Sequence, residues 1–352
     1  MKVPALLQLR RLFIASRWLL FGALAVVAAG LLVAGAACGG DGKKSVEKLF
    51  SPQANQLDIY DLKTGESTVL IPADRNTVNG QTCLLPDGDG NFLLGEDTGQ
   101  EDGERQGWGI FEPDGTFVRK ILEPETPNEP EQIEPYGCAF DGDDRLFVSD
   151  IGSGSFDATD GKLIVYFPAD YEQSCILDAN LRVAGAVAID DEGNVYVTES
   201  VPQGKVLRFS PPFPTSAGEC DTVTVSKSTF IEDPDVQTPL GMLRAPNGNW
   251  YVSSVFIPPA VREYDADGQF VRTIAEGDDI GTPAGLAVDA EGTLYYADLG
   301  IVAQPGELPG PEAGKGTVRK ITFDAYGDPS APEIIGQGLD YPDAVAVLSV
   351  EE

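Results

Sequence analysis

The fold is decided by the stretch Pro283-Ala284-Gly285-Leu286-Ala287-Val288-Asp289-Ala290-Glu291-Gly292-Thr293-Leu294-Tyr295-Tyr296-Ala297-Asp298. Its apolar run is short and almost continuous, which suits an inner strand that neighbouring elements cover on both faces. Asp289 can bond the local backbone and Gly292 can take a positive φ, so we expect the chain to reverse there into a hairpin. The residues after the turn form a second strand that ends on Asp298.

The same phrase recurs along the chain at intervals of roughly 50 residues, which is the period of a radial or solenoidal array. Between copies, the stretch 111–121 is matched by 264–274, and both predict a strand, an Asp-Gly hairpin and a second strand. Each unit therefore holds four strands, which suits the blade of a propeller. The inner strands of five complete units are expected near Cys83, Cys138, Val187, Met242 and Leu286.

A sixth unit is split between the two ends of the sequence. Residues 341–347 supply an inner strand, while 57–61 and 67–71 supply outer strands. Pairing them in one blade closes the ring and removes the exposed edges that an open array would have. We therefore expect an all-β fold over residues 46–352: a six-bladed β-propeller with four-stranded blades, closed by N- and C-terminal strands that share one blade.

The phrase Pro-x-Gly-Leu-Ala-Val-Asp-x-x-Gly resembles the repeat of the NHL propellers and of the SMP-30/gluconolactonase and strictosidine-synthase-like propellers. The run 294–298 is also similar to YWTD blades. The resemblance covers nearly all of the chain after the N-terminal segment and implies the six-bladed fold. It implies little about chemistry, because these families include lactonases, phosphotriesterases, lyase-like synthases and binding modules on one scaffold.

The N-terminal segment does not contain the repeat. In it, four basic residues precede an uncharged stretch over 18–37. This order is typical of an export signal or a membrane anchor. Residues 35–37 and Cys38 resemble a bacterial lipoprotein cleavage site, although Gly35 stands where that family usually has Leu. Three alternatives stay open: lipidation of Cys38, an uncleaved span of about 20 residues, and ordinary signal cleavage. The basic residues are Lys2, Arg10, Arg11 and Arg17.

Each alternative places the propeller outside the cytoplasm of a bacterial cell, attached to the membrane through its N-terminus only or released. We accordingly expect residues 1–37 to be a signal peptide or membrane anchor and residues 38–45 to be a tether after Cys38.

Four cysteines remain after Cys38, and export would allow them to form disulfides. Cys83 and Cys138 occupy matching positions on successive inner strands, whereas Cys175 and Cys220 lie near the outer strands of successive blades. On these positions we favour pairing Cys83 with Cys138 and Cys175 with Cys220, although neighbouring blades splay apart toward the rim, where the second pair lies. The alternative is that the inner pair are buried free thiols.

Charge and composition exclude several function classes. The chain carries a formal net charge of −32, so nucleic acid and anionic lipid surfaces would be repelled and are not expected partners. It contains no histidine, which excludes Ser-His-Asp and Cys-His nucleophile systems and any site that needs an imidazole. We expect a monomer.

The resemblance to SMP-30-type hydrolases implies a Ca²⁺ ion on the propeller axis, held by residues that precede the repeat's Gly. Ca²⁺ needs six or more oxygen ligands. Only Gln81 and Asp343 resemble such ligands here, so the family's calcium shell does not transfer and no cofactor is assigned. The weak metal candidates are Asp343, Gln81 and Asp150. The axial positions are Gln81, Tyr136, Gly185, Leu240, Ala284 and Asp343.

A second ring is formed by the residues that end the second strands. Successive strands reverse direction, so these residues should lie on the same face as the axial ones. The longest loops, 97–106, 151–160 and 300–315, leave from that face, and binding usually resides in such loops. This acidic mouth would bind Ca²⁺ or a cationic ligand, or supply paired carboxylates; alternatively, its acids bond backbone N–H groups of the next turn. The ring comprises Glu96, Asp150, Glu199, Ser254 and Asp298.

Arg244 departs from the repeat, since other copies have Phe140, Ile189 or Val288 at this position. A charge within an inner strand needs a partner. We expect Arg244 to pair with a neighbouring carboxylate or to be turned outward by a bulge, and the alternative is a ligand anchor.

Two functions follow from these observations. The first is a membrane-tethered, extracytoplasmic propeller that binds a small molecule or a protein at its loop-rich face without chemistry. The alternative is a divergent calcium-dependent hydrolase of lactones or esters that uses the acidic mouth.

Overall fold

The computed structural model describes residues 45–53, 56–72, 83–86, 91–96, 107–122, 135–256, 258–302 and 309–351. Lys44–Glu352 forms one compact unit. The predicted signal or anchor over 1–37, Cys38 with nearly all of its tether, and Gln81 lie outside the described residues, as does the side chain of Glu96. Within those ranges, no helix is long and apolar enough to cross a bilayer.

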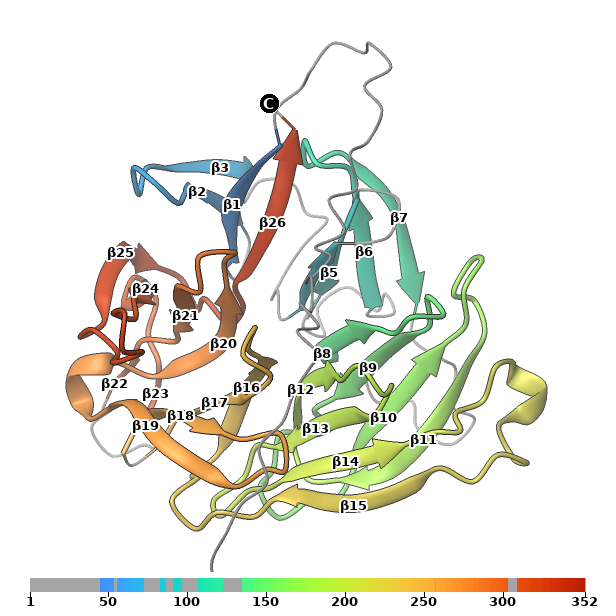
Figure 1. Cartoon of the computed structure of the whole chain (residues 1–352). Helices are drawn as coiled ribbons and strands as arrows, with labels where there is room; N and C mark the ends of the chain where they lie inside the picture. Colours follow the sequence, from blue (N-terminus) through green and yellow to red (C-terminus); the bar gives the residue numbers. More distant parts are fainter. Residues whose placement is uncertain are drawn as a thin grey trace, which may run out of the picture. The chain divides into compact units, whose positions relative to one another are not determined.

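Six four-stranded antiparallel sheets surround a common centre, which confirms the expected propeller (Figure 1). Blade 1 contains β4 (Leu84–Pro86), β5 (Phe92–Glu96), β6 (Gly107–Phe111) and β7 (Phe117–Leu122). Blade 2 contains β8 (Pro135–Phe140), β9 (Leu146–Asp150), β10 (Gly161–Tyr166) and β11 (Ser174–Leu181). Blade 3 contains β12 (Ala184–Ile189), β13 (Val195–Glu199), β14 (Val206–Ser210) and β15 (Ser226–Ile231).

The other three blades follow the same order from inner to outer strand. Blade 4 contains β16 (Pro239–Arg244), β17 (Trp250–Ser254), β18 (Ala260–Tyr264) and β19 (Phe270–Glu276). Blade 5 contains β20 (Pro283–Val288), β21 (Leu294–Asp298), β24 (Gly316–Ile321) and β25 (Glu333–Leu339), and a two-stranded ribbon, β22 (Ile301–Val302) with β23 (Gly310–Pro311), is inserted before β24. The closing blade contains β26 (Ala346–Glu351), β1 (Ser45–Pro52), β2 (Leu57–Asp61) and β3 (Ser67–Ile71).

The closing blade joins the two ends of the unit, as expected, but its inner strand begins at Ala346 and not at residue 341, and its second strand was not identified from the sequence. β1 pairs antiparallel with β26 from Ser45 opposite Glu351 to Phe50 opposite Ala346. It also pairs with β2 along its other edge, from Lys48 to Pro52. Leu49 and Phe50 are buried, so an N-terminal strand is inserted between the inner strand and the two predicted outer strands.

The Pro-x-Gly part of the repeated phrase forms a β-bulge at the start of the inner strand. In blade 2, Pro135 pairs with Asp150 and Cys138 pairs with Val148, so two residues, Tyr136 and Gly137, oppose the single residue Ser149. The same irregularity occurs at the starts of β12, β16 and β20. The bulge is therefore a repeated feature that sets the backbone at the start of four inner strands.

Hydroxyl groups link these bulges from one blade to the next. The Ser253 Oγ accepts a hydrogen bond from the Gly241 N–H at 2.7 Å and donates one to the Ala284 carbonyl of blade 5 at 2.7 Å. Ser149 accepts in the same way from the N–H of Gly137, at 2.7 Å, and donates to the Gly185 carbonyl of blade 3. The penultimate residue of a second strand thus satisfies the bulge and holds the neighbouring blade.

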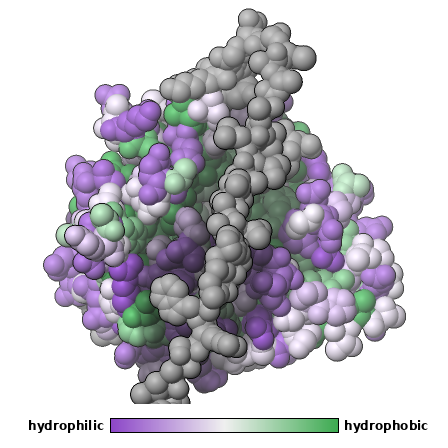
Figure 2. Space-filling model, viewed as in Figure 1, coloured by the Kyte–Doolittle hydropathy of each residue, from purple (hydrophilic) through white to green (hydrophobic). Residues whose placement is uncertain are grey.

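Two disulfides also connect successive blades, in the pairing that the sequence favoured. Cys83 and Cys138, whose Cα atoms are 5.8 Å apart, join the inner edges of blades 1 and 2. Cys175 and Cys220, at 5.4 Å, join β11 to the loop between β14 and β15. Blades 1, 2 and 3 are therefore covalently linked to one another. Elsewhere, apolar residues fill the space between blades. On the face that Figure 2 shows, many of the described residues at the surface are hydrophilic.

Candidate functional site

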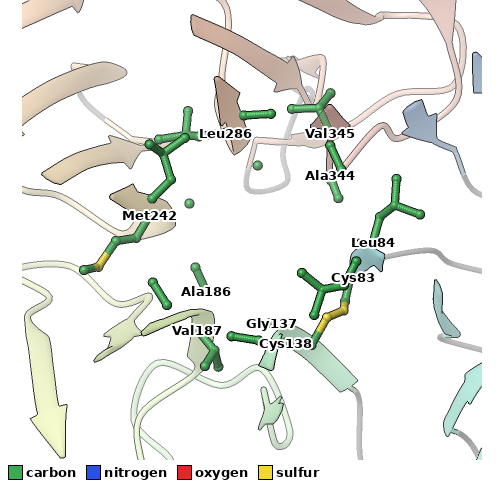
Figure 3. A pocket seen from close by; sticks show the side chains of 18 of the residues that line it. Cys83, Leu84, Gly137, Cys138, Ala186, Val187, Met242, Leu286, Ala344 and Val345 are labelled. Atoms are coloured by element: carbon green, nitrogen blue, oxygen red, sulfur yellow. A yellow bond between two sulfur atoms is a disulfide. The ribbon is translucent and has the colours of Figure 1, made fainter. Parts of the chain in front are cut away.

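A channel of about 500 Å³ runs between the inner strands of all six blades. Its wall is mostly apolar because the inner strands carry the apolar part of the repeat on both faces. Figure 3 shows Met242, Leu286 and Val345 around this channel, together with the Cys83–Cys138 disulfide. A concave, mainly apolar site that includes a small number of polar groups is the usual form of a small-molecule pocket.

The channel is closed at the end where the inner strands begin. There Tyr136, Leu240 and Ala284 are buried, and they pack against Val255 and Leu299. Three more apolar residues, which are half-buried and follow the second strands, lie against this cluster: Ile151, Phe256 and Ile301. Among the described residues, apolar side chains therefore cover the closed end of the channel, which lies on the loop-rich face.

Accessibility increases toward the other end of the inner strands. In β8 and β16 the first four residues are buried and the last two are half-buried. The last residues of β12 and β20, Ile189 and Val288, are half-buried as well. In β8 and β16 the end nearer the Asp-x-x-Gly turns is therefore the more accessible one, and we call this end of the channel its open end.

One polar contact crosses the closed end of the channel. The Tyr136 hydroxyl donates a hydrogen bond to Oδ1 of Asp343 at 3.2 Å, which joins blade 2 to the chain leading into the closing blade. Burial raises the pKa of the Tyr136 phenol well above its ordinary value, and the Asp343 charge and hydrogen bond add to this effect. The phenol is thus a protonated donor, and the pair provides a hydrogen-bonding point in an apolar site.

The other axial positions that the structure describes supply no side-chain ligand for a cation. Gly185, Leu240 and Ala284 have no side-chain oxygen, so the described axial residues cannot form the shell of six or more oxygens that Ca²⁺ takes. Across the described ranges, no three His, Cys, Asp or Glu side chains are grouped closely enough to hold a metal ion. A bound Ca²⁺ does not fit the described part of this channel.

The acids at the strand ends are engaged in hydrogen bonds and ion pairs within their own blades. Asp150 is 1% exposed, lies 3.2 Å from the ammonium of Lys162 and accepts a hydrogen bond from the N–H of Gly152. Glu199 accepts one from the N–H of Arg182 at 3.1 Å. These contacts are of the kind expected for strand-terminal acids that hold the next turn.

Asp298 is held by groups from two neighbouring segments of its own blade. It accepts hydrogen bonds from the Thr282 N–H at 2.7 Å, the Thr317 hydroxyl at 2.8 Å and the Arg319 guanidinium at 2.9 Å. Ser254, the uncharged member of the ring, is 1% exposed. None of Asp150, Glu199, Ser254 and Asp298 lines the channel, so the structure separates these residues from the axial ones.

No protein-family model matches the chain, and no curated protein matches it in sequence. Solved structures do resemble it. A luciferin-regenerating enzyme aligns with a TM-score of 0.56 and 12% identity, over 86% of this chain and 96% of that one. A gluconolactonase from Xanthomonas campestris aligns at 0.50 and 17%, over 72% and 84%. The chain is a six-bladed β-propeller.

A third similar structure is virginiamycin B lyase from Staphylococcus aureus with quinupristin, in a catalytically inactive form that has a histidine replaced by alanine. It aligns with a TM-score of 0.50 and 12% identity, over 84% of this chain and 88% of that one. At such identities the likeness establishes the propeller fold and leaves activity to the residues of the site.

Arg244 lies at the open end of this propeller's channel and lines it. Its guanidinium is paired with carboxylates of the first turn of blade 3, at 3.5 Å from Asp191 and 4.0 Å from Glu192. It also lies over the Trp250 ring, 5.6 Å from the centroid. The neighbouring carboxylate expected from the sequence is therefore present, and Arg244 reaches the channel as well.

Sequence reasoning did not identify the apolar wall as a candidate site. Residues such as Met242 and Leu286 were assigned to inner strands, where apolar side chains are expected for the core. The sequence offered one indication: the apolar repeat is present, but most of its axial positions have no side-chain oxygen that could bind a metal. That signal excluded the family's metal site but did not show that a cavity remained.

Proposed function

We propose that this propeller is a binding protein that takes an apolar small molecule into its axial channel and performs no chemistry on it. The observation that carries the proposal is the apolar wall of the channel, interrupted at its closed end by the Tyr136–Asp343 pair. Apolar pockets with one or two fixed polar groups bind ligands by burial and orient them by hydrogen bonding.

The residue types at the described axial positions support binding without chemistry. The chain has no histidine, and the described axial residues provide neither a metal shell nor a pair of carboxylates facing each other across the channel. The second candidate, a hydrolase of lactones or esters, is favoured by the fold shared with a gluconolactonase and by the buried phenol next to Asp343.

Binding is tested with 1-N-phenylnaphthylamine, an uncharged apolar fluorophore. We expect saturable one-to-one binding that Leu286→Trp weakens about 10-fold or more, because the larger side chain occupies channel volume. A thermal melt of Leu286→Trp shows whether the variant is folded. The wild-type protein, incubated with a panel of lactones and aryl esters in the presence of Ca²⁺, should give no turnover. Turnover that Asp343→Asn abolishes would replace this proposal with the hydrolase.

We further propose that the propeller is exported and tethered to the outer side of a bacterial membrane through its N-terminus. The basic and apolar order of the first 37 residues supports export. Two disulfides between blades suit an oxidising compartment. Palmitate labelling of expressing cells should mark the wild-type chain and not Cys38→Ala, and equal labelling of the two would exclude lipidation at Cys38.

A further inference from the structure

Arg244 is an unusual residue for the wall of an apolar channel. It ends β16, where the corresponding residues of β8, β12 and β20 are Phe140, Ile189 and Val288. It is the one basic residue among the described residues that line the channel. An apolar residue at this position would match the other copies and avoid a free-energy cost, because a charged side chain in a partly desolvated wall loses hydration.

Arg244 lines the channel, and its side chain is still partly accessible. Its side chain is 25% exposed, and it lies over the Trp250 ring, which restricts its position. The guanidinium carries five N–H donors in a planar fork that matches a carboxylate.

The carboxylates already paired with Arg244 are weak competitors for it. The N–O separations of 3.5 and 4.0 Å are longer than a charge-assisted hydrogen bond of about 2.8 Å. The Asp191 and Glu192 side chains are 90% and 71% exposed, so water screens both pairs. A carboxylate that binds the fork directly would gain hydrogen bonds that these two acids do not make at such separations.

The dimensions of the channel set the length of the rest of the ligand. Leu240 lies at the closed end and Arg244 at the open end of the same strand, four residues apart. At a rise of about 3.3 Å per residue, the apolar wall between these two levels is about 13 Å long. A ligand that reaches from Arg244 to the closed end therefore has an apolar body of roughly this length.

We propose that the channel binds an apolar small molecule that carries one carboxylate, with Arg244 binding the carboxylate at the open end and the apolar body extending toward Tyr136. This inference rests on the proposed binding function of the channel. It adds the chemical class of the ligand, an amphipathic carboxylate, and the residue that selects it.

Decanoate and decanol, which share a tail and differ in the head group, test this inference by calorimetry. The wild-type protein should bind decanoate about 10-fold or more tightly than decanol, as a direct charge-assisted pair would give. Arg244→Met should remove this preference by weakening decanoate binding about 10-fold or more. Arg244→Lys should give an intermediate preference, since the charge remains and the fork is lost.

Removing the competing acids gives a prediction of opposite sign. The double variant Asp191→Asn/Glu192→Gln should tighten decanoate binding several-fold and leave decanol binding unchanged. Arg182→Met is the matched control for Arg244→Met, because both remove one arginine. Arg182 donates a hydrogen bond to the Phe156 carbonyl and is not among the residues that line the channel, so this control should keep the preference for decanoate. If Arg244→Met does not fold, the Lys variant and the double variant still test the role of Arg244.

The outcomes separate the two proposals. Equal binding of decanoate and decanol, or a preference that survives in Arg244→Met, would overturn the role of Arg244 and leave the channel as a binding site. Failure of both molecules and of the uncharged fluorophore to bind would overturn the binding function and this inference together.

Discussion

The glycine of the repeated phrase is required by the distance between neighbouring blades. A Cβ atom added at Gly137 would lie 2.5 Å from the Val187 N and 2.6 Å from the Gly185 carbonyl oxygen, both in the backbone of the next blade. At Gly241 it would collide with the Ala284 carbonyl oxygen. The backbones of neighbouring blades approach this closely at the bulge, where Ser149 or Ser253 links them. Only glycine allows such an approach.

Gly241→Ala is therefore expected to lower the free energy of unfolding by about 2–3 kcal/mol, as overpacking of a well-packed site does. Gly142→Ala is the control, because no heavy atom lies within 4 Å of its added Cβ and its φ is not positive. The control should change the free energy by less than about 0.5 kcal/mol. Urea unfolding measures both changes, and similar values for the two variants would show that blade spacing does not depend on Gly241.

At the scale of strands, the phrase located the inner strands well because each combines a turn signal with an apolar run. β1 was missed because Glu47 and Lys48 interrupt its alternation, and its burial depends on β26, which is nearly 300 residues away along the chain. Its pairing became visible only when both ends were placed in one blade. A strand whose partners are so distant has little local signal.

The roles of the strand-terminal acids also depended on distant strands. The sequence placed Asp298 at the end of β21, and from there it could equally have faced a ligand. Thr317 and Arg319, from β24, occupy its oxygens instead. The insertion that contains β22 and β23 separates β21 from β24 in sequence, so no spacing rule would have indicated this contact.

At the scale of the whole molecule, ring closure decides what the axial residues can do. Tyr136 and Asp343 are 207 residues apart and meet across the closed end of the channel. Their identities were known from the repeat register, and the resemblance to metal-binding propellers directed attention to their face. In the structure, an apolar cluster covers that end, and exposure rises along β8 toward the opposite end, so the opposite end is the more accessible one. Burial of this kind is a property of the assembled ring.

Repulsion between acidic residues affects the stability of the whole molecule and does not belong to any single blade. With 56 acidic and 24 basic residues, the folded chain concentrates like charges, and their repulsion destabilises the compact state. Salt screens this repulsion, because the Debye length falls to about 10 Å at 0.1 M. We therefore expect the Tm to rise by several degrees between about 20 and 500 mM NaCl.

CaCl₂ and MgCl₂ at equal concentration should raise the Tm equally, since the described residues form no calcium shell. A rise specific to Ca²⁺ that saturates at micromolar concentration would instead reveal a calcium site.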